Sequence, residues 1–143
     1  MIMDATGQFS NAQAITASAA STNLIDLGAG SRAGGTGNKG AGRGTPIPLT
    51  INVVEAFATL TSLAISVQTD DNAAFSSAKT VWTSPAYTLA ELNLALTGDQ
   101  TLLPDSLPIS VEERYVRLYY TVGGSNATTG KITAGVVGAR QNA

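Results

Sequence analysis

The chain has 143 residues, a net charge of −2, no cysteine and no histidine. The missing cysteine excludes disulfides and thiolate metal sites, and the missing histidine excludes imidazole catalysis, His-ligated zinc and His-dependent triads. The weakly negative net charge does not favour binding to the negatively charged backbone of nucleic acids. We therefore expect no enzyme, no metal or cofactor, and no nucleic-acid partner.

Apolar residues make up 43% of the chain and charged residues 13%, about half of the usual charged share of about 25%. This composition excludes simple disorder, and the length fits one domain, placed at residues 1–143. No apolar run approaches about 18 residues, and the first residues lack the basic and apolar regions of a signal peptide. We expect a protein that is made in a cytoplasm and has no membrane partner.

The amino-terminal part predicts an arm followed by strands. Residues 1–9 are expected to be an N-terminal arm, either frayed or docked on a neighbouring subunit. Residues 11–21 are ambiguous, because alanine favours helix whereas an Ile-Thr pair among serines suits a strand. Residues 23–27 predict a short strand. We expect strand in both places because the rest of the chain is strand.

Residues 28–44 are a low-complexity insertion in which eight of 17 residues are glycine. The segment contains Arg32, Lys39 and Arg43 and no acid, so it is locally basic on an acidic chain. Loops of more than about 12–15 residues without structure of their own tend to be functional or disordered. The segment predicts a long Gly-rich loop that is either mobile in solvent or ordered by an acidic partner surface.

Two patterns in this loop formally match phosphate-binding motifs: GxGxxA at residues 28–33 and GxGxxG at residues 35–40. The dinucleotide motif requires a helix whose amino terminus faces the pyrophosphate. Here more glycine follows, and then a Thr-Pro-Ile-Pro run that stops any helix. We therefore assign no cofactor to these patterns.

The middle of the chain predicts further strands, at residues 49–57, 63–70 and 76–83, from apolar residues in alternation. Trp82 is expected at the edge of the core, with a sugar-stacking role as the alternative. Thr88 and Glu91 have the spacing of a helix capping box and predict a helical turn. Residues 101–109 contain two prolines, which disfavour helix in the preceding residues, so this stretch is expected to be extended and to bridge two sheets.

Two pairs of adjacent acids, Asp70-Asp71 and Glu112-Glu113, are the nearest approach to a catalytic or metal-binding constellation. Neighbouring residues on a strand point to opposite faces, so neither pair is expected to converge on one substrate. The spaced acids and final glutamate of a calcium loop are missing after Asp70. Both pairs are interpreted as turn or surface residues.

The most regular pattern lies in residues 112–124. Successive side chains on a strand point to opposite faces, so this strand has one apolar face and one mixed face, the latter with Tyr115, Arg117 and Tyr119. A second run, residues 131–137, follows after a short polar loop, and the two are predicted to pair as an antiparallel hairpin. Together the strands predict an all-β fold, an antiparallel jelly-roll-like β-sandwich with a long Gly-rich loop.

Four stretches also carry a family resemblance: Phe9–Thr16, Ala19–Gly28, Arg114–Val122 and Gly130–Val136. In order and spacing, across nearly the whole chain, they resemble the small jelly-roll capsid cement (decoration) proteins of tailed bacteriophages, of the Bordetella-phage type. The Gly-rich loop at residues 28–44 is where the chain departs from the common pattern.

The resemblance implies a structural virion protein, made in the host bacterial cytoplasm, that binds the outer capsid surface and stabilises the head. Its partners would be the major capsid protein and further copies of itself, a dimer being favoured over a trimer. The candidate contact residues come from the arm, the loop and the patterned strand: Met1, Ile2, Phe9, Arg32, Lys39, Arg43, Tyr115, Arg117 and Tyr119.

Two other functions stay open from the residues alone. The first is a carbohydrate-binding β-sandwich in which Trp82 or the tyrosines stack on sugar rings. The second is a structural module of a phage tail or baseplate. A glycan array tests the first, and the position of the protein within the virion tests the second.

Overall fold

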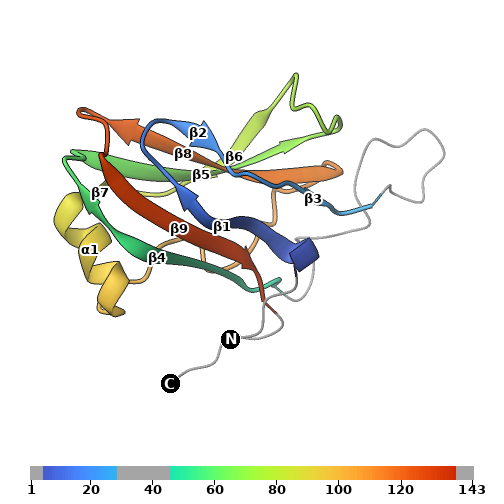
Figure 1. The fold of residues 1–143 in the computed structure, drawn as a ribbon. Coiled ribbons are helices and arrows are strands. Elements are labelled where there is room, and N and C mark those ends of the chain that lie inside the picture. The colour runs from blue at the N-terminus through green and yellow to red at the C-terminus, as the bar shows by residue number, and fades with distance from the viewer. Residues whose placement is uncertain (1–4, 29–45, 138–143) are drawn as a thin grey trace.

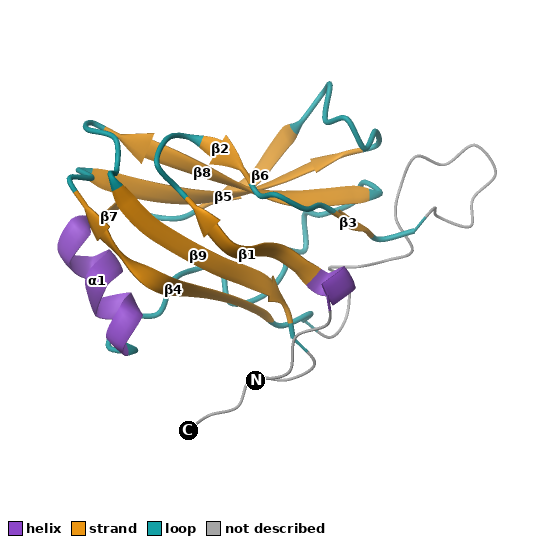
Figure 2. Cartoon of the chain, viewed as in Figure 1, coloured by secondary structure: helices purple, strands orange, loops and turns teal. Residues whose placement is uncertain are grey.

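A computed structural model describes residues 5–28 and 46–137. Two antiparallel sheets lie face to face (Figures 1 and 2). The smaller sheet has the order β1-β9-β4, and the larger has β2-β8-β5-β6, with β3 also pairing with β8 and β7 with β5. The elements are η1 (Ala5–Gly7), β1 (Gln8–Ala14), β2 (Ala19–Ala20), β3 (Ile25–Asp26), β4 (Leu49–Ala58), β5 (Ser62–Asp70), β6 (Lys79–Thr83), β7 (Tyr87–Thr88), α1 (Leu89–Thr97), β8 (Tyr115–Gly123) and β9 (Thr129–Val136).

The strand pairing is nested along the chain. The first strand, β1, pairs with the last, β9, and β2 and β3 pair with the last but one, β8. β4 then joins the other side of β9, and β5 joins the other side of β8. This connectivity is that of a jelly roll, in which a folded ribbon of paired strands makes two sheets. The prediction of an all-β antiparallel sandwich is confirmed.

The core lies between the two sheets. Val116, Leu118 and Tyr120 on β8 are fully buried, as their shared parity predicts. In the larger sheet Ile65 lies opposite Tyr120, and Val67 opposite Leu118. Because side chains on one face of a strand recur every second residue, this register gives the larger sheet one continuous apolar face toward the smaller sheet.

The predicted hairpin between residues 112–124 and 131–137 is wrong, because β8 and β9 lie in different sheets. Residues 124–128 carry the chain across the sandwich, beside the equivalent crossing from β4 to β5. The two crossings are joined by hydrogen bonds, from Thr128 N to Ala58 O (3.1 Å) and from Ser125 N to Thr61 Oγ1 (3.1 Å). A short polar loop can close a hairpin or cross between sheets, so loop length alone does not identify the partner strand.

The predicted arm at residues 1–9 is also corrected. η1 begins at Ala5, β1 begins at Gln8, and Phe9 is fully buried in the core. Phe9 is therefore a core residue and not a partner contact, because an aromatic ring on the inward face of β1 removes a large apolar area from water. The strand expected at residues 11–21 is interrupted: β1 ends at Ala14, and β2 pairs with the other sheet.

Helix α1 protects the outer edge of β4. Its capping box is confirmed, since Glu91 N donates to Thr88 Oγ1 (3.4 Å) and Thr88 N donates to Glu91 Oε2 (2.7 Å), and the helix runs on to Thr97. Asn93 on α1 accepts a hydrogen bond from Phe57 N (2.9 Å) and donates one to Phe57 O (3.2 Å). The amide thus binds the backbone groups of Phe57 to which a further strand would bind. Figure 1 shows α1 lying beside β4.

The extended stretch at residues 101–109 bridges the two sheets, as predicted. Next to β4, Leu49 N donates to Asp105 O (2.9 Å) and Leu107 N donates to Ile47 O (3.0 Å). Just beyond it, Ser110 Oγ reaches the carbonyl oxygen of Val81 on β6, at 3.5 Å. The segment therefore closes the side of the sandwich next to β4 and β6.

A pair of hydroxyl groups links the sheets through the core. Tyr120 of the larger sheet and Ser10 of the smaller one are fully buried, and their oxygens are 2.8 Å apart. Ser10 donates its proton to Gln13 Oε1 (2.7 Å), so Tyr120 is the donor to Ser10. Burial raises the pKa of Tyr120 to about 12, although the bond to Ser10 acts in the other direction. The phenol therefore stays protonated and keeps its donor role.

We predict that Phe9→Ala lowers the free energy of unfolding by about 3–5 kcal/mol, the usual loss for a buried phenylalanine. Chemical denaturation measures it. Val54→Ala, also in the smaller sheet but 46% exposed, is the control and is expected to change stability by no more than about 0.5 kcal/mol. An equally small loss of stability for Phe9→Ala would mean that Phe9 is not part of the core and would favour the predicted arm.

Tyr120→Phe is expected to cost about 1 kcal/mol, the net value of a typical internal hydrogen bond. A double-mutant cycle with Ser10→Ala separates this bond from changes in packing, because the coupling free energy reports the pair alone. We expect a coupling of about 1 kcal/mol, measured by denaturant unfolding. A coupling of zero would mean that the two hydroxyls do not stabilise the sandwich together.

Candidate partner-binding face

The outward side chains of β8 form the candidate site, which we call the β8 face: Tyr115, Arg117 and Tyr119. All three are half-buried, and they alternate with fully buried residues of the same strand. On the neighbouring strand β5, Gln68 lies opposite Arg117, and Ser66 lies opposite Tyr119. The period of two thus places an arginine between two tyrosines in one row on the outside of the larger sheet.

Arg117 is held in place from several sides. Its Nε donates a hydrogen bond to Gln68 Oε1 at 2.9 Å. Its guanidinium carbon lies 4.2 Å from the centre of the Phe75 ring and 5.9 Å from that of Tyr119. A cation over an aromatic face is attracted by the quadrupole of the ring. The guanidinium is therefore oriented before any partner arrives.

Phe75 was not among the residues predicted for the site. It lies in the loop between β5 and β6, has a φ of 52°, and is 8% exposed. A left-handed backbone at a non-glycine residue costs on the order of 1–3 kcal/mol and persists only where surrounding contacts hold it. A single aromatic residue among small and polar residues is the sequence signal that points to it.

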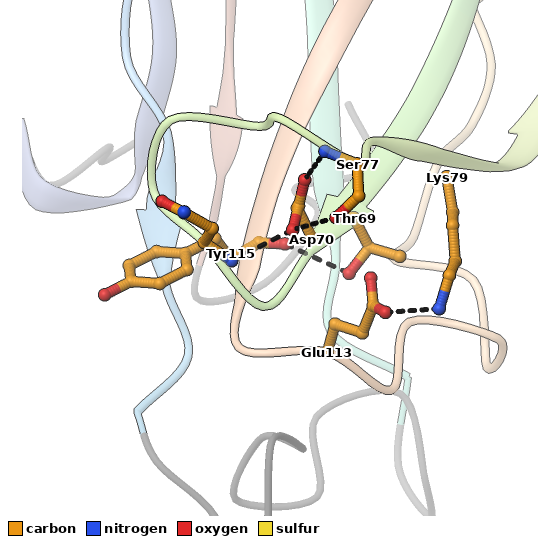
Figure 3. A network of polar contacts seen from close by, with 7 residues as sticks. Thr69, Asp70, Ser77, Lys79, Glu113 and Tyr115 are labelled. Atoms are coloured by element: carbon orange, nitrogen blue, oxygen red, sulfur yellow. Dashed lines mark hydrogen bonds and ion pairs between the residues drawn. The ribbon is translucent and has the colours of Figure 1, made fainter.

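The carboxylate of Asp70 orders this loop. It is fully buried and accepts hydrogen bonds from Asn72 N (3.0 Å), Ser77 N (2.8 Å) and Ser77 Oγ (3.1 Å), two of them visible in Figure 3. Burial is the largest single influence and raises the pKa of Asp70, but the hydrogen bonds together lower it below its usual value. Asp70 is therefore ionised, and its charge is engaged by the loop that carries Phe75.

Asp71 is exposed at the start of the turn that follows β5, as its interpretation as a turn residue predicts. A hydrogen bond with the Asp70 carboxyl raises the pKa of Asp71, as do burial and repulsion from Asp70 and Glu113. Lys79 forms an ion pair with Glu113 beside them (Figure 3). In the described ranges no three acidic, cysteine or histidine side chains gather as a metal site requires.

Tyr115 borders the same network without joining it by its ring. Thr69 Oγ1 donates to the carbonyl oxygen of Tyr115 (3.0 Å), while the ring points away from Asp70 (Figure 3). The guanidinium carbon of Arg114 lies 5.0 Å from the centre of this ring. Arg114 also binds Asp26 on β3 through two nitrogens, each 2.8 Å from an oxygen. Tyr115 is thus fixed at the end of the row where β3 meets β8.

The other predicted contact residues divide into two groups. Phe9 lies in the core, as described above, and five residues lie outside the described ranges: Met1, Ile2, Arg32, Lys39 and Arg43. Trp82 is partly buried against the core, which confirms its predicted place at the core edge.

Over residues 5–28 and 46–137, no helix has the length and apolar character needed to span a membrane.

The fold is an antiparallel jelly-roll sandwich, and its outer face carries the tyrosine and arginine side chains that are enriched in protein interfaces. The model of the Bbp16 family matches residues 9–136, so the chain belongs to this family of Bordetella phage proteins. The family indicates a structural protein of a phage. No curated protein matches the chain.

We predict opposite effects for the two adjacent acids at pH 7. Asp70→Asn is expected to lower the melting temperature, because it removes the carboxylate that holds the loop. Asp71→Asn is expected to leave the melting temperature unchanged or raise it, because it removes the repulsion on Asp70. Thermal unfolding of both variants and the wild type measures this.

The pH dependence follows from the directions of the pKa values. The pKa of Asp70 is lowered in the folded protein, so its stabilising effect is present above the ordinary value of about 3.8 and is lost as the pH falls through the folded value. The loss caused by Asp70→Asn should therefore shrink as the pH falls below the ordinary value of 3.8 and through the lower folded pKa. A loss that grows as the pH falls would contradict an ionised anchor.

Proposed function

We propose that this protein is a capsid cement (decoration) protein, which binds the outer surface of a phage head and links neighbouring major capsid proteins. The observation that carries the proposal is the Bbp16 match over residues 9–136, since it covers nearly the whole jelly roll and belongs to a family of phage proteins. A small protein of this kind acts by contact, so its function depends on its surfaces.

The composition of the β8 face supports a contact function. Tyrosine and arginine are the residues that most often dominate the binding free energy of an interface. Here they lie on a paired strand in the middle of the larger sheet, and Arg117 is already oriented by Gln68 and Phe75. Ordering that exists before binding lowers the entropic cost of association. The face is thus suited to a rigid partner such as an assembled shell.

Cementing requires that one copy or one oligomer of the protein contacts more than one capsid subunit. We propose a homo-oligomer, with a dimer favoured over a trimer, placed on a symmetry axis of the shell. Closed symmetry presents the same face twice, so two weak contacts act together with a high effective concentration. Binding to the assembled shell and not to separated subunits then stabilises the shell by mass action.

The test uses heads of the encoding phage that are assembled without this protein and then mixed with the purified chain. We expect saturable co-sedimentation, new density on the outer surface in electron microscopy, and a higher temperature of head disruption. Tails purified from the same phage are the control and should bind nothing. Density confined to the tail or baseplate, or no binding to heads, would overturn the proposal.

A further inference from the structure

We infer that Arg117 is the anchor of the β8 face and binds a carboxylate group of an aspartate or glutamate on the capsid protein. This inference rests on the proposed function and adds to it the partner chemistry.

The charge balance singles out Arg117. Over residues 5–28 and 46–137, the other three basic side chains each lie beside an acid: Lys79 beside Glu113, Arg114 beside Asp26 and Lys131 beside Glu55. Arg117 has the neutral amide oxygen of Gln68 as its hydrogen-bond acceptor, and within the described residues its two terminal nitrogens have no partner. The half-buried cation therefore lacks the anion that its neighbours have.

The acid that lies next to Arg117 on the neighbouring strand already has hydrogen-bond partners of its own. Asp70 lies two residues from Gln68 on the same face of β5, but its oxygens accept hydrogen bonds from Asn72 and Ser77. Its charge orders the loop and does not form an ion pair with Arg117. Among the residues that the structure describes, no acid forms an ion pair with Arg117, so the carboxylate of a partner can take this position.

The orientation of the guanidinium selects the shape of this anion. The bond from Nε to Gln68 and the ring of Phe75 fix the plane of the group, so its terminal nitrogens form a rigid fork. A planar fork with two donors matches the two oxygens of a carboxylate, and such charge-assisted pairs are roughly twice as strong as neutral hydrogen bonds. Little side-chain freedom remains to be lost on binding.

The surroundings favour a protein carboxylate over the phosphates of a nucleic acid. Tyr115 and Tyr119 flank the cation with aromatic surface that excludes water, as around the central residues of protein interfaces. Nucleic acid binding instead requires several cations along a backbone, whereas this face presents one unpaired cation on a protein of net charge −2. One oriented cation between aromatic rings fits a single acidic side chain.

The first experiment compares two variants that each remove one positive charge, from opposite sheets of the sandwich. Arg117→Gln is expected to weaken binding to heads that lack the protein by about tenfold or more. Lys131→Gln is the matched control, because Lys131 is on β9 and already paired with Glu55, and it should change the affinity less than about twofold. Arg117→Lys should lie between, since lysine keeps the charge and loses the fork.

The second experiment tests the carboxylate directly. Heads are treated with a carbodiimide and an amine, which convert exposed carboxyl groups to amides. Wild-type binding should fall to about the level of Arg117→Gln on untreated heads, and the variant should lose much less. Unchanged wild-type binding to treated heads would overturn the inference, and it does so even if Arg117→Gln proves unstable in thermal unfolding.

The outcomes separate the two levels of the argument. If the wild type does not bind untreated heads, the proposed function fails. If the wild type binds and Arg117→Gln binds equally well, the cement function stands and the inference about Arg117 is wrong. If Arg117→Gln changes the oligomeric state in sedimentation while binding per subunit is unchanged, the acidic partner is a second copy of the chain, and the inference of a capsid carboxylate is also wrong.

Discussion

β5 and β8 pair residue by residue from Ser62 opposite Gly123 to Asp70 opposite Tyr115. This register places Leu118 and Tyr120 in the core and, by the same period of two, places Arg117 outside next to Gln68. A slip of one residue would exchange the two faces of the strand and lose both the core and the oriented arginine. The burial of the apolar face fixes the register of the two strands. The positions of the residues on the outer face therefore follow from the hydrophobic effect and not from their own contacts.

The loop after β5 connects the buried carboxylate of Asp70 to the orientation of Arg117 on the surface. Asp70 holds the turn through the backbone, the turn holds Phe75 in a left-handed conformation, and the ring of Phe75 lies over Arg117. Each contact depends on the one before it, so a substitution of Asp70 should alter the orientation of Arg117 although the two side chains are not paired. The aromatic surface around the cation lowers the local dielectric response and strengthens any charge–charge contact made there.

Local patterns in the sequence predicted most of the strands and the helix cap, but neither the break in the strand expected at residues 11–21 nor the partners of each strand. The alternation in residues 112–124 and the spacing of Thr88 and Glu91 concern neighbours in the chain, and both predictions are confirmed. The hairpin prediction failed because the pairing of strands across the sandwich depends on the total apolar area that is buried, which the length of a short loop does not reveal. Phe75 was missed for a similar reason, since its contact with Arg117 spans distant parts of the chain.

Asn93 on α1 binds both backbone groups of Phe57 at the rim of the smaller sheet. An open rim would allow molecules to join strand to strand into fibres while they accumulate in the cell. Because the Asn93 side chain occupies both groups, another copy of the chain cannot pair with β4 at Phe57. The helix therefore acts against edge-to-edge aggregation at this point of the smaller sheet.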